Sequence, residues 1–188
     1  MEDRVYINNF DTKGDCSVNG HKAEALFKNL AIKRNWIVKE AEKSDNIHKH
    51  IDFFIYHKNL GLVLKIDVKS RKKISRKDKS FNNEWTWLEY KNVKGHSGWL
   101  LGESSHIAFE REDEFVIVPR EELFLWSKKA MAEHHGYNGK VTINCKAKNA
   151  EDARYKYYQR RKDLVTLVRY QDIINNIANV KIWNKLLI

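Results

Sequence analysis

Two neighbouring apolar segments, residues 50–56 and 62–69, each carry one aspartate. Turn-forming Asn and Gly residues lie between the segments, so we expect an antiparallel hairpin. Asp52 lies directly opposite Asp67 when the turn is centred between residues 59 and 60, and side chains that alternate along a strand put both carboxylates on one face. The other face is apolar, so a slip of one residue would bury the charges, and the pattern therefore specifies this register.

Opposed carboxylates of this kind suit a divalent cation. The two charges repel across the strand pair, and a bound cation removes that repulsion. Hard oxygen ligands favour Mg²⁺ or Mn²⁺, with water in the remaining positions. Lys69 points to the same face, where its charge can stabilise a phosphate or lower the pKa of an attacking water. The alternative is a solvated face with a weak Asp–Lys pair.

The charge of the chain indicates a polyanionic partner. The sequence has 35 Lys and Arg against 25 Asp and Glu, a net charge of +10, and the excess is concentrated in residues 65–79 and 146–162. The second segment interleaves tyrosines with its cations, a pattern typical of proteins that stack on unpaired bases. We expect nucleic acid, and DNA rather than RNA, as the partner. The predicted contacts to nucleic acid are Arg71, Lys72, Lys73, Arg76, Lys77, Arg154, Lys156, Arg160, Arg161 and Lys162.

The sequence also leads us to exclude several classes of protein. No stretch is long and apolar enough for a transmembrane helix, and the first residues lack the apolar block of a signal peptide. Cys16 and Cys145 are too few for a disulfide framework or a structural zinc site. We therefore expect a cytoplasmic protein that does not bind membranes.

The elements that must position these residues form a mixed α/β pattern. Apolar residues recur at helical spacing over residues 21–35, and strands are expected to follow. The fold class is α/β (α+β), with a mixed central β-sheet flanked by helices. We expect one domain over residues 1–188, with a core of about 14–126 and a helical, basic extension of about 127–188. Besides the hairpin, we predict strands at 36–39, 85–90, 107–110, 115–118, 141–145 and 164–169, and helices at about 119–134, 150–160 and from 172 onward.

The residues of the hairpin also carry a family resemblance. HIDFFI, followed by Asp67-Val68-Lys69 in LKIDVKS, resembles the PD-(D/E)XK nuclease superfamily, in which an Asp on one strand precedes an Asp/Glu-x-Lys triplet on the next. Glu24, in GHKAEALF, matches the acidic residue that many members carry on the preceding helix. The resemblance covers about residues 14–70 and includes phage-encoded nucleases and Holliday-junction resolvases. It implies a restriction-endonuclease-like core and, for a phage protein, the host cytoplasm.

The resemblance implies metal-dependent hydrolysis of DNA phosphodiester bonds, with an endonuclease preferred. Asp52 and Asp67 would hold Mg²⁺ or Mn²⁺, the Val68 carbonyl would be a third ligand, and Glu24 would complete the shell or hold a second ion. Lys69 would assist the attack of water, so the predicted catalytic residues are Glu24, Asp52, Asp67 and Lys69.

Three alternatives remain open at this stage. Asp67 can instead be the first acid of the motif, with Glu89-x-Lys91 as the triplet; we prefer the first assignment because it accounts for Glu24. A non-catalytic nucleic-acid-binding protein on the same fold fits the charge equally well. The sequence does not fix the oligomeric state, and a homodimer is one option.

Overall fold

The computed structural model of the protein describes residues 15–75, 77–134 and 146–187. Arg76 and the strand predicted at 141–145 lie outside the described residues. No described helix is long and apolar enough to cross a membrane. The helices are α1 (Asp15–Lys33), α2 (Lys43–Lys49), α3 (Arg120–His134) and α4 (Tyr170–Asn176), with single 3₁₀ turns η1 (Trp99–Leu101), η2 (Glu151–Ala153) and η3 (Lys185–Leu187). The strands are β1 (Trp36–Glu40), β2 (Phe53–His57), β3 (Leu62–Lys69), β4 (Trp85–Lys91), β5 (His106–Glu110), β6 (Glu114–Pro119), β7 (Leu164–Arg169) and β8 (Lys181–Asn184).

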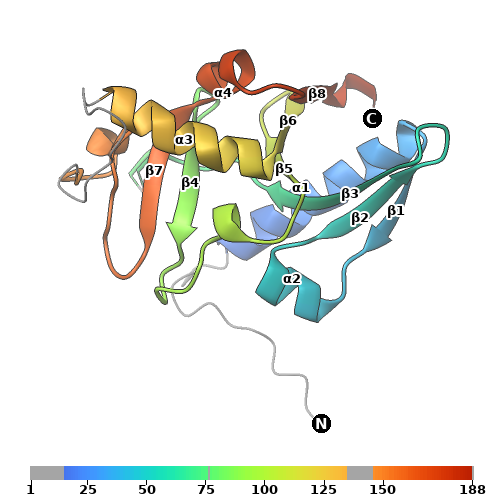
Figure 1. Ribbon diagram of the computed structural model, residues 1–188, viewed down its shortest axis with the longest axis horizontal. Helices are drawn as coiled ribbons and strands as arrows, with labels where there is room; N and C mark the ends of the chain where they lie inside the picture. The colour runs from blue at the N-terminus through green and yellow to red at the C-terminus, as the bar shows by residue number, and fades with distance from the viewer. Residues whose placement is uncertain (1–14, 76, 135–145, 188) are drawn as a thin grey trace, which may run out of the picture.

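The described strands form two sheets, which confirms a mixed α/β architecture (Figure 1). The larger sheet has the order β1-β2-β3-β5-β6-β8, and its only parallel pair is β3 with β5. The smaller sheet pairs β4 with β7 in antiparallel orientation. Parallel strands need a long crossover connection between them. The crossover from β3 to β5 contains β4 and η1, so it passes through the smaller sheet.

The predicted hairpin register is confirmed. Phe53 pairs with Ile66 and Phe54 with Lys65, the register that sets Asp52 opposite Asp67. Gly61 in the turn has a φ of 60°, a left-handed conformation that glycine adopts without strain. Alternation along the hairpin, together with the turn residues, was therefore sufficient to place the two aspartates.

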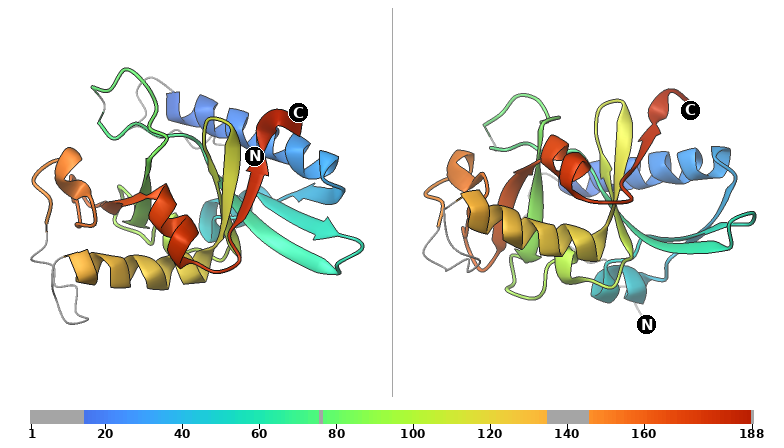
Figure 2. Two further views of the ribbon diagram at one scale, coloured as in Figure 1. Left: turned by 90° about the horizontal axis from the view of Figure 1, so that it is seen from above. Right: turned by 45° about the horizontal axis from the view of Figure 1, so that its top comes forward.

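Helix α1 covers one face of the larger sheet, and α3 lies on the opposite side (Figure 2, left). The buried side of α1 includes Ala23, Phe27 and Leu30, which pack with residues of β1, β2, β3, β5, β6 and β8. The Phe27 ring lies 6.1 Å from Phe53 and 5.5 Å from Trp183, measured between centroids. This packing sets the orientation of α1, and with it the position of Glu24, which lies next to the buried residues of the helix.

Replacing Phe27 with Ala should destabilise the fold by about 3–5 kcal/mol, since it removes a fully buried ring from a packed cluster. Ile32→Ala is the matched control, because Ile32 lies on the same helix and is 51% exposed, so its loss should cost less than about 0.5 kcal/mol. Urea unfolding of both variants measures the difference. Equal effects would mean that α1 is not held by this cluster.

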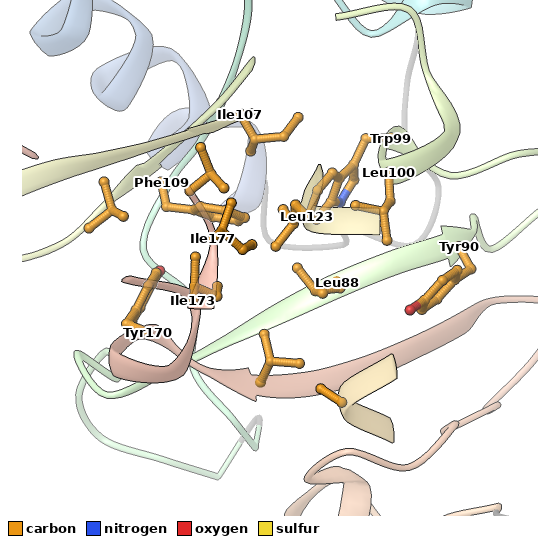
Figure 3. Close-up of a cluster of buried hydrophobic side chains, with 14 of the residues drawn as sticks. Leu88, Tyr90, Trp99, Leu100, Ile107, Phe109, Leu123, Tyr170, Ile173 and Ile177 are labelled. Carbon is orange, nitrogen blue, oxygen red and sulfur yellow. The ribbon is translucent and has the colours of Figure 1, made fainter. Parts of the chain in front are cut away.

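The other face of the larger sheet packs against the smaller sheet, α3 and α4. Ile107 and Phe109 of β5 meet Leu88 of β4 and Leu123 of α3 in one buried cluster (Figure 3). Residues of β5 and β6 alternate between this cluster and the one beneath α1. The two sheets therefore share a continuous core, and β4 is held beside the end of β3.

Three parts of the secondary structure differ from the prediction. Helix α2 was not predicted, because none of its residues is buried and it has no apolar stripe. The helix predicted at 150–160 is wrong: the described backbone there has the single turn η2, followed by hydrogen bonds to β7. The helix predicted from 172 onward ends at Asn176, and β8 follows and pairs with β6.

Candidate active site

Hydrogen bonds from β3 and α2 hold the Asp52 carboxylate in place. Asp52 precedes β2 by one residue, and its backbone N–H continues the ladder by donating to the carbonyl of Ile66 at 2.8 Å. Its Oδ2 accepts a hydrogen bond from the Val68 backbone N–H at 2.6 Å, and its Oδ1 accepts one from Asn46 of α2 at 2.5 Å. The orientation of this carboxylate is therefore set before any ligand binds.

The Asp67 carboxylate is buried and only partly satisfied. Its side chain is 3% exposed, and its Oδ1 accepts a hydrogen bond from the Lys69 ammonium at 2.6 Å. No group of the described protein donates a hydrogen bond to its buried Oδ2. Burial raises the pKa of Asp67 to about 8; Lys69 partly opposes the rise, and Asp52 adds to it through its charge and through a hydrogen bond between the two side chains, which requires a proton on one carboxyl. A cation bound between the two carboxylates would replace this proton.

Lys69 is held as a cation at the end of β3. Its ammonium lies 5.3 Å from the centroid of the Trp99 ring, in addition to its contact with Asp67. Burial alone would lower the pKa of Lys69, but the carboxylates of Asp67 and Asp52 outweigh burial and raise it. The side chain therefore supplies positive charge at neutral pH, and it does not act as a base in this state.

Helix α1 brings Glu24 to the same site. Burial raises the pKa of Glu24, and the next largest contribution is the nearby charge of Asp52, with Lys69 acting in the opposite direction. The structure thus brings together the four residues predicted as catalytic: Glu24, Asp52, Asp67 and Lys69.

Glu89 reaches this site as well, from the second sheet. Burial raises the pKa of Glu89, and Lys69 is the largest opposing charge. Gly98 allows the close approach of η1 to β4, since a Cβ there would lie 2.4 Å from the Glu89 carbonyl oxygen. Lys91, the other member of the alternative triplet, is exposed beyond an irregularity in the ladder. The alternative triplet in the sequence names Glu89, but no sequence signal placed Trp99 beside Lys69, because that position depends on the packing of the two sheets.

His50 occupies a position different from the predicted one. It begins the segment 50–56 that was predicted as a strand, but it is the left-handed C-cap of α2, with φ 55° and ψ 56°. Its pKa is lowered by burial first and by the charge of Lys69 next. A neutral imidazole therefore lies beside the carboxylates at neutral pH.

The residues present fit a magnesium-like ion bound by two carboxylates. In the part of the chain that the structure describes, no group of three or more His, Cys, Asp or Glu side chains is close enough to hold a metal. Mg²⁺ does not require such a cage, since it keeps several waters and binds through one or two carboxylates. Asp52 and Asp67 would supply that donor set once the proton between them is lost. The contact recorded for Val68 is made by its N–H, so its predicted carbonyl ligand stays a prediction.

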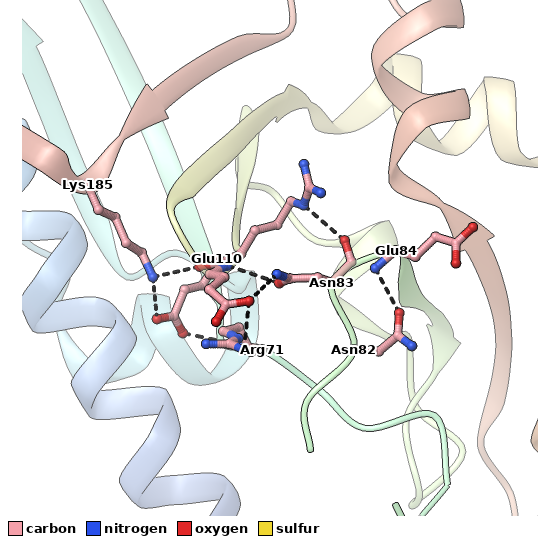
Figure 4. Close-up of polar contacts among 8 residues, drawn as sticks. Arg71, Asn82, Asn83, Glu84, Glu110 and Lys185 are labelled. Carbon is pink, nitrogen blue, oxygen red and sulfur yellow. Dashed lines mark hydrogen bonds and ion pairs between the residues drawn. The ribbon is translucent and has the colours of Figure 1, made fainter.

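The first basic segment forms a loop between β3 and β4 that is tied down at both ends. Glu110 accepts hydrogen bonds from the Arg71 backbone N–H and from the Lys185 ammonium, as Figure 4 shows. Asn83 donates to Glu112 at 2.7 Å and, through its carbonyl, accepts from Arg111. The loop therefore presents Lys72, Lys73 and Lys77, all exposed, on an anchored backbone.

The second basic segment lies beside β7. The Arg154 guanidinium is 5.0 Å from the centroid of the Trp85 ring, and Lys156 pairs with Asp152 at 2.8 Å. Lys162 lies against the turn at Gly95, and Arg160 and Arg161 are exposed. The predicted nucleic-acid contacts that the structure describes therefore come from two loops that flank the smaller sheet.

The chain matches no protein-family model, no curated protein and no solved structure.

Proposed function

We propose that the protein is a Mg²⁺-dependent DNA nuclease of the PD-(D/E)XK type, with a restriction-endonuclease-like core. The observation that carries the proposal is the buried carboxyl of Asp67, which is hydrogen-bonded to the Asp52 side chain and lies 2.6 Å from the Lys69 ammonium. This set of groups combines a place for a divalent cation with a fixed positive charge, the two requirements for phosphodiester hydrolysis.

In this proposal each residue has a defined part. Asp52 and Asp67 hold Mg²⁺, which when bound would polarise the phosphate and lower the pKa of a coordinated water. Lys69, kept charged by its neighbouring carboxylates, stabilises the negative charge that develops on the phosphate oxygens. Glu24 adds a further carboxylate at the edge of the site. The lysines of the loop between β3 and β4 neutralise the nucleic-acid backbone and position it without selecting its sequence.

The decisive experiment is a cleavage assay on linear, circular, single-stranded and four-way-junction DNA, with Mg²⁺, with Mn²⁺ and with EDTA. Asp67→Ala should lower the cleavage rate by at least about 1,000-fold, and Lys69→Ala by about 100- to 1,000-fold, as for other groups that stabilise developing charge. Asp113→Ala is the control, because Asp113 is an exposed aspartate on the turn between β5 and β6.

Two other outcomes would contradict parts of the proposal. Cutting that survives Lys69→Ala and is lost in Asp67→Ala, Glu89→Ala and Lys91→Ala would assign the reaction to the other acid-x-Lys triplet, in which Asp67 is the first acid. Salt-sensitive DNA binding without cutting under any metal would favour a non-catalytic binding protein. The pairing of Lys69 with Asp67 favours that second candidate, since it partly neutralises the site without a cation.

A further inference from the structure

One face of β4 leads away from the candidate active site. Thr86, Leu88 and Tyr90 point into the core, so the alternating residues Trp87 and Glu89 lie on the other face. At one end of this face the backbone of Glu89 packs against Gly98, which precedes η1, and the Lys69 ammonium lies 5.3 Å from the ring of Trp99 in η1. Whatever binds along the face would therefore reach the site.

Trp87 joins the two basic loops on this face. Its indole N–H donates to the Lys73 carbonyl at 3.1 Å, and its ring lies 6.2 Å from the Tyr158 ring, tilted by 35°. Lys73 belongs to the loop between β3 and β4, and Tyr158 to the segment that precedes β7. The two cationic segments thus meet at one aromatic side chain, although Lys73 and Tyr158 are 85 positions apart in the sequence.

Three aromatic residues of this region do not pack into the hydrophobic core. Phe81, Trp87 and Tyr158 belong to neither of the two buried clusters found in the described chain. Phe81 is 38% exposed, and the Arg71 guanidinium lies 5.3 Å from its ring centroid. The Trp87 and Tyr158 rings are half-buried. Partly exposed rings that lie near cations are typical of surfaces that bind single-stranded nucleic acid, where bases stack and phosphates are neutralised.

We propose that Phe81, Trp87 and Tyr158, with Arg71, Lys73 and Arg154, bind an unpaired stretch of nucleic acid and lead it to Lys69. This inference depends on the proposed nuclease function and adds its substrate class. Charge complementarity favours a polyanion, and the rings favour one with unpaired bases, because a duplex buries the base faces in its own stack.

The test measures binding apart from cleavage. Fluorescence anisotropy in EDTA compares a labelled 20-nucleotide single strand with its duplex, using the full chain. The wild type should bind the single strand at least about 10-fold more tightly, and Tyr158→Ser and Phe81→Ser should each weaken single-strand binding about 5- to 100-fold while leaving duplex binding nearly unchanged. Trp87→Leu should also weaken single-strand binding and leave duplex binding nearly unchanged. If Trp87→Leu fails to fold, the Tyr158 and Phe81 variants still test the inference.

Two controls make the result specific. Tyr56→Ser removes a 39% exposed ring from β2 and should leave both affinities unchanged. Lys73→Ala should weaken both substrates equally, because it removes a phosphate contact. Equal affinity for duplex and single strand, or equal losses on both in the aromatic variants, would overturn the inference. Such a result would leave the nuclease proposal standing if the wild type cuts DNA and Asp67→Ala does not.

Discussion

Replacing Asp67 with Asn should make the metal-free protein more stable while it abolishes cleavage. The pKa of Asp67 rises from 3.8 to about 8 on folding, mainly through burial. A pKa raised on folding contributes stability that is fully present below pH 3.8 and is lost as the pH rises through 8. The Asn side chain does not ionise, so the Asp67→Asn variant does not lose this stability as the pH rises.

The pH dependence gives the prediction its test. The difference in melting temperature between Asp67→Asn and wild type should grow from pH 5 to pH 8 and level off above, reaching about 2–4 kcal/mol, or roughly 5–15 °C for a chain of this size. Asp113→Asn is the matched control and should follow the wild type. A variant less stable than wild type at pH 8 would mean that Asp67 is held as a stabilising carboxylate, and its role as an incompletely satisfied ligand would be wrong.

Local patterns were sufficient to predict the hairpin that carries the two aspartates. The alternation of apolar and charged residues in β2 and β3, with a turn that contains Gly61, specifies one register, and the structure has that register. The apolar stripe of residues 21–35 predicts the helix, whereas the role of Glu24 came only from the family resemblance. These predictions depend on interactions between residues that are close in sequence, which periodicity describes well.

The rest of the site depends on contacts that no local pattern encodes. Helix α2 lacks an apolar face, yet it supplies Asn46 to orient Asp52. Glu89 and Trp99 reach Lys69 only because β4 pairs with β7, a strand more than 70 residues further along the chain. The choice of strand partner is a tertiary effect, and propensity does not predict it.

The wrong helix at 150–160 shows the same limit. Its charged and aromatic residues are compatible with a helix, but Tyr155 and Tyr158 donate backbone hydrogen bonds to Leu167 and Val165 of β7. Pairing with an existing strand satisfies these backbone groups and positions the Tyr158 ring against Trp87. The segment thus became part of the surface that we propose for nucleic acid.

The affinity of the site for Mn²⁺ should increase as the pH rises from 6 to 8. A cation that binds the Asp67 carboxylate must displace its proton, and the pKa of that carboxyl is about 8. Below this pKa the apparent dissociation constant should fall by about tenfold per pH unit, and above it the constant should level off, because metal binding then releases no proton.

Isothermal titration calorimetry in two buffers of different ionisation enthalpy measures both quantities. At pH 7 the wild type should release about one proton for each Mn²⁺ bound, whereas Asp67→Asn should bind weakly and with little dependence on pH. Asp113→Asn should behave as the wild type does. An affinity that is the same at pH 6 and pH 8 would show that the cation does not use Asp67, and the proposed metal site would be wrong. Because this measurement needs no DNA, it tests the chemistry of the site independently of the substrate.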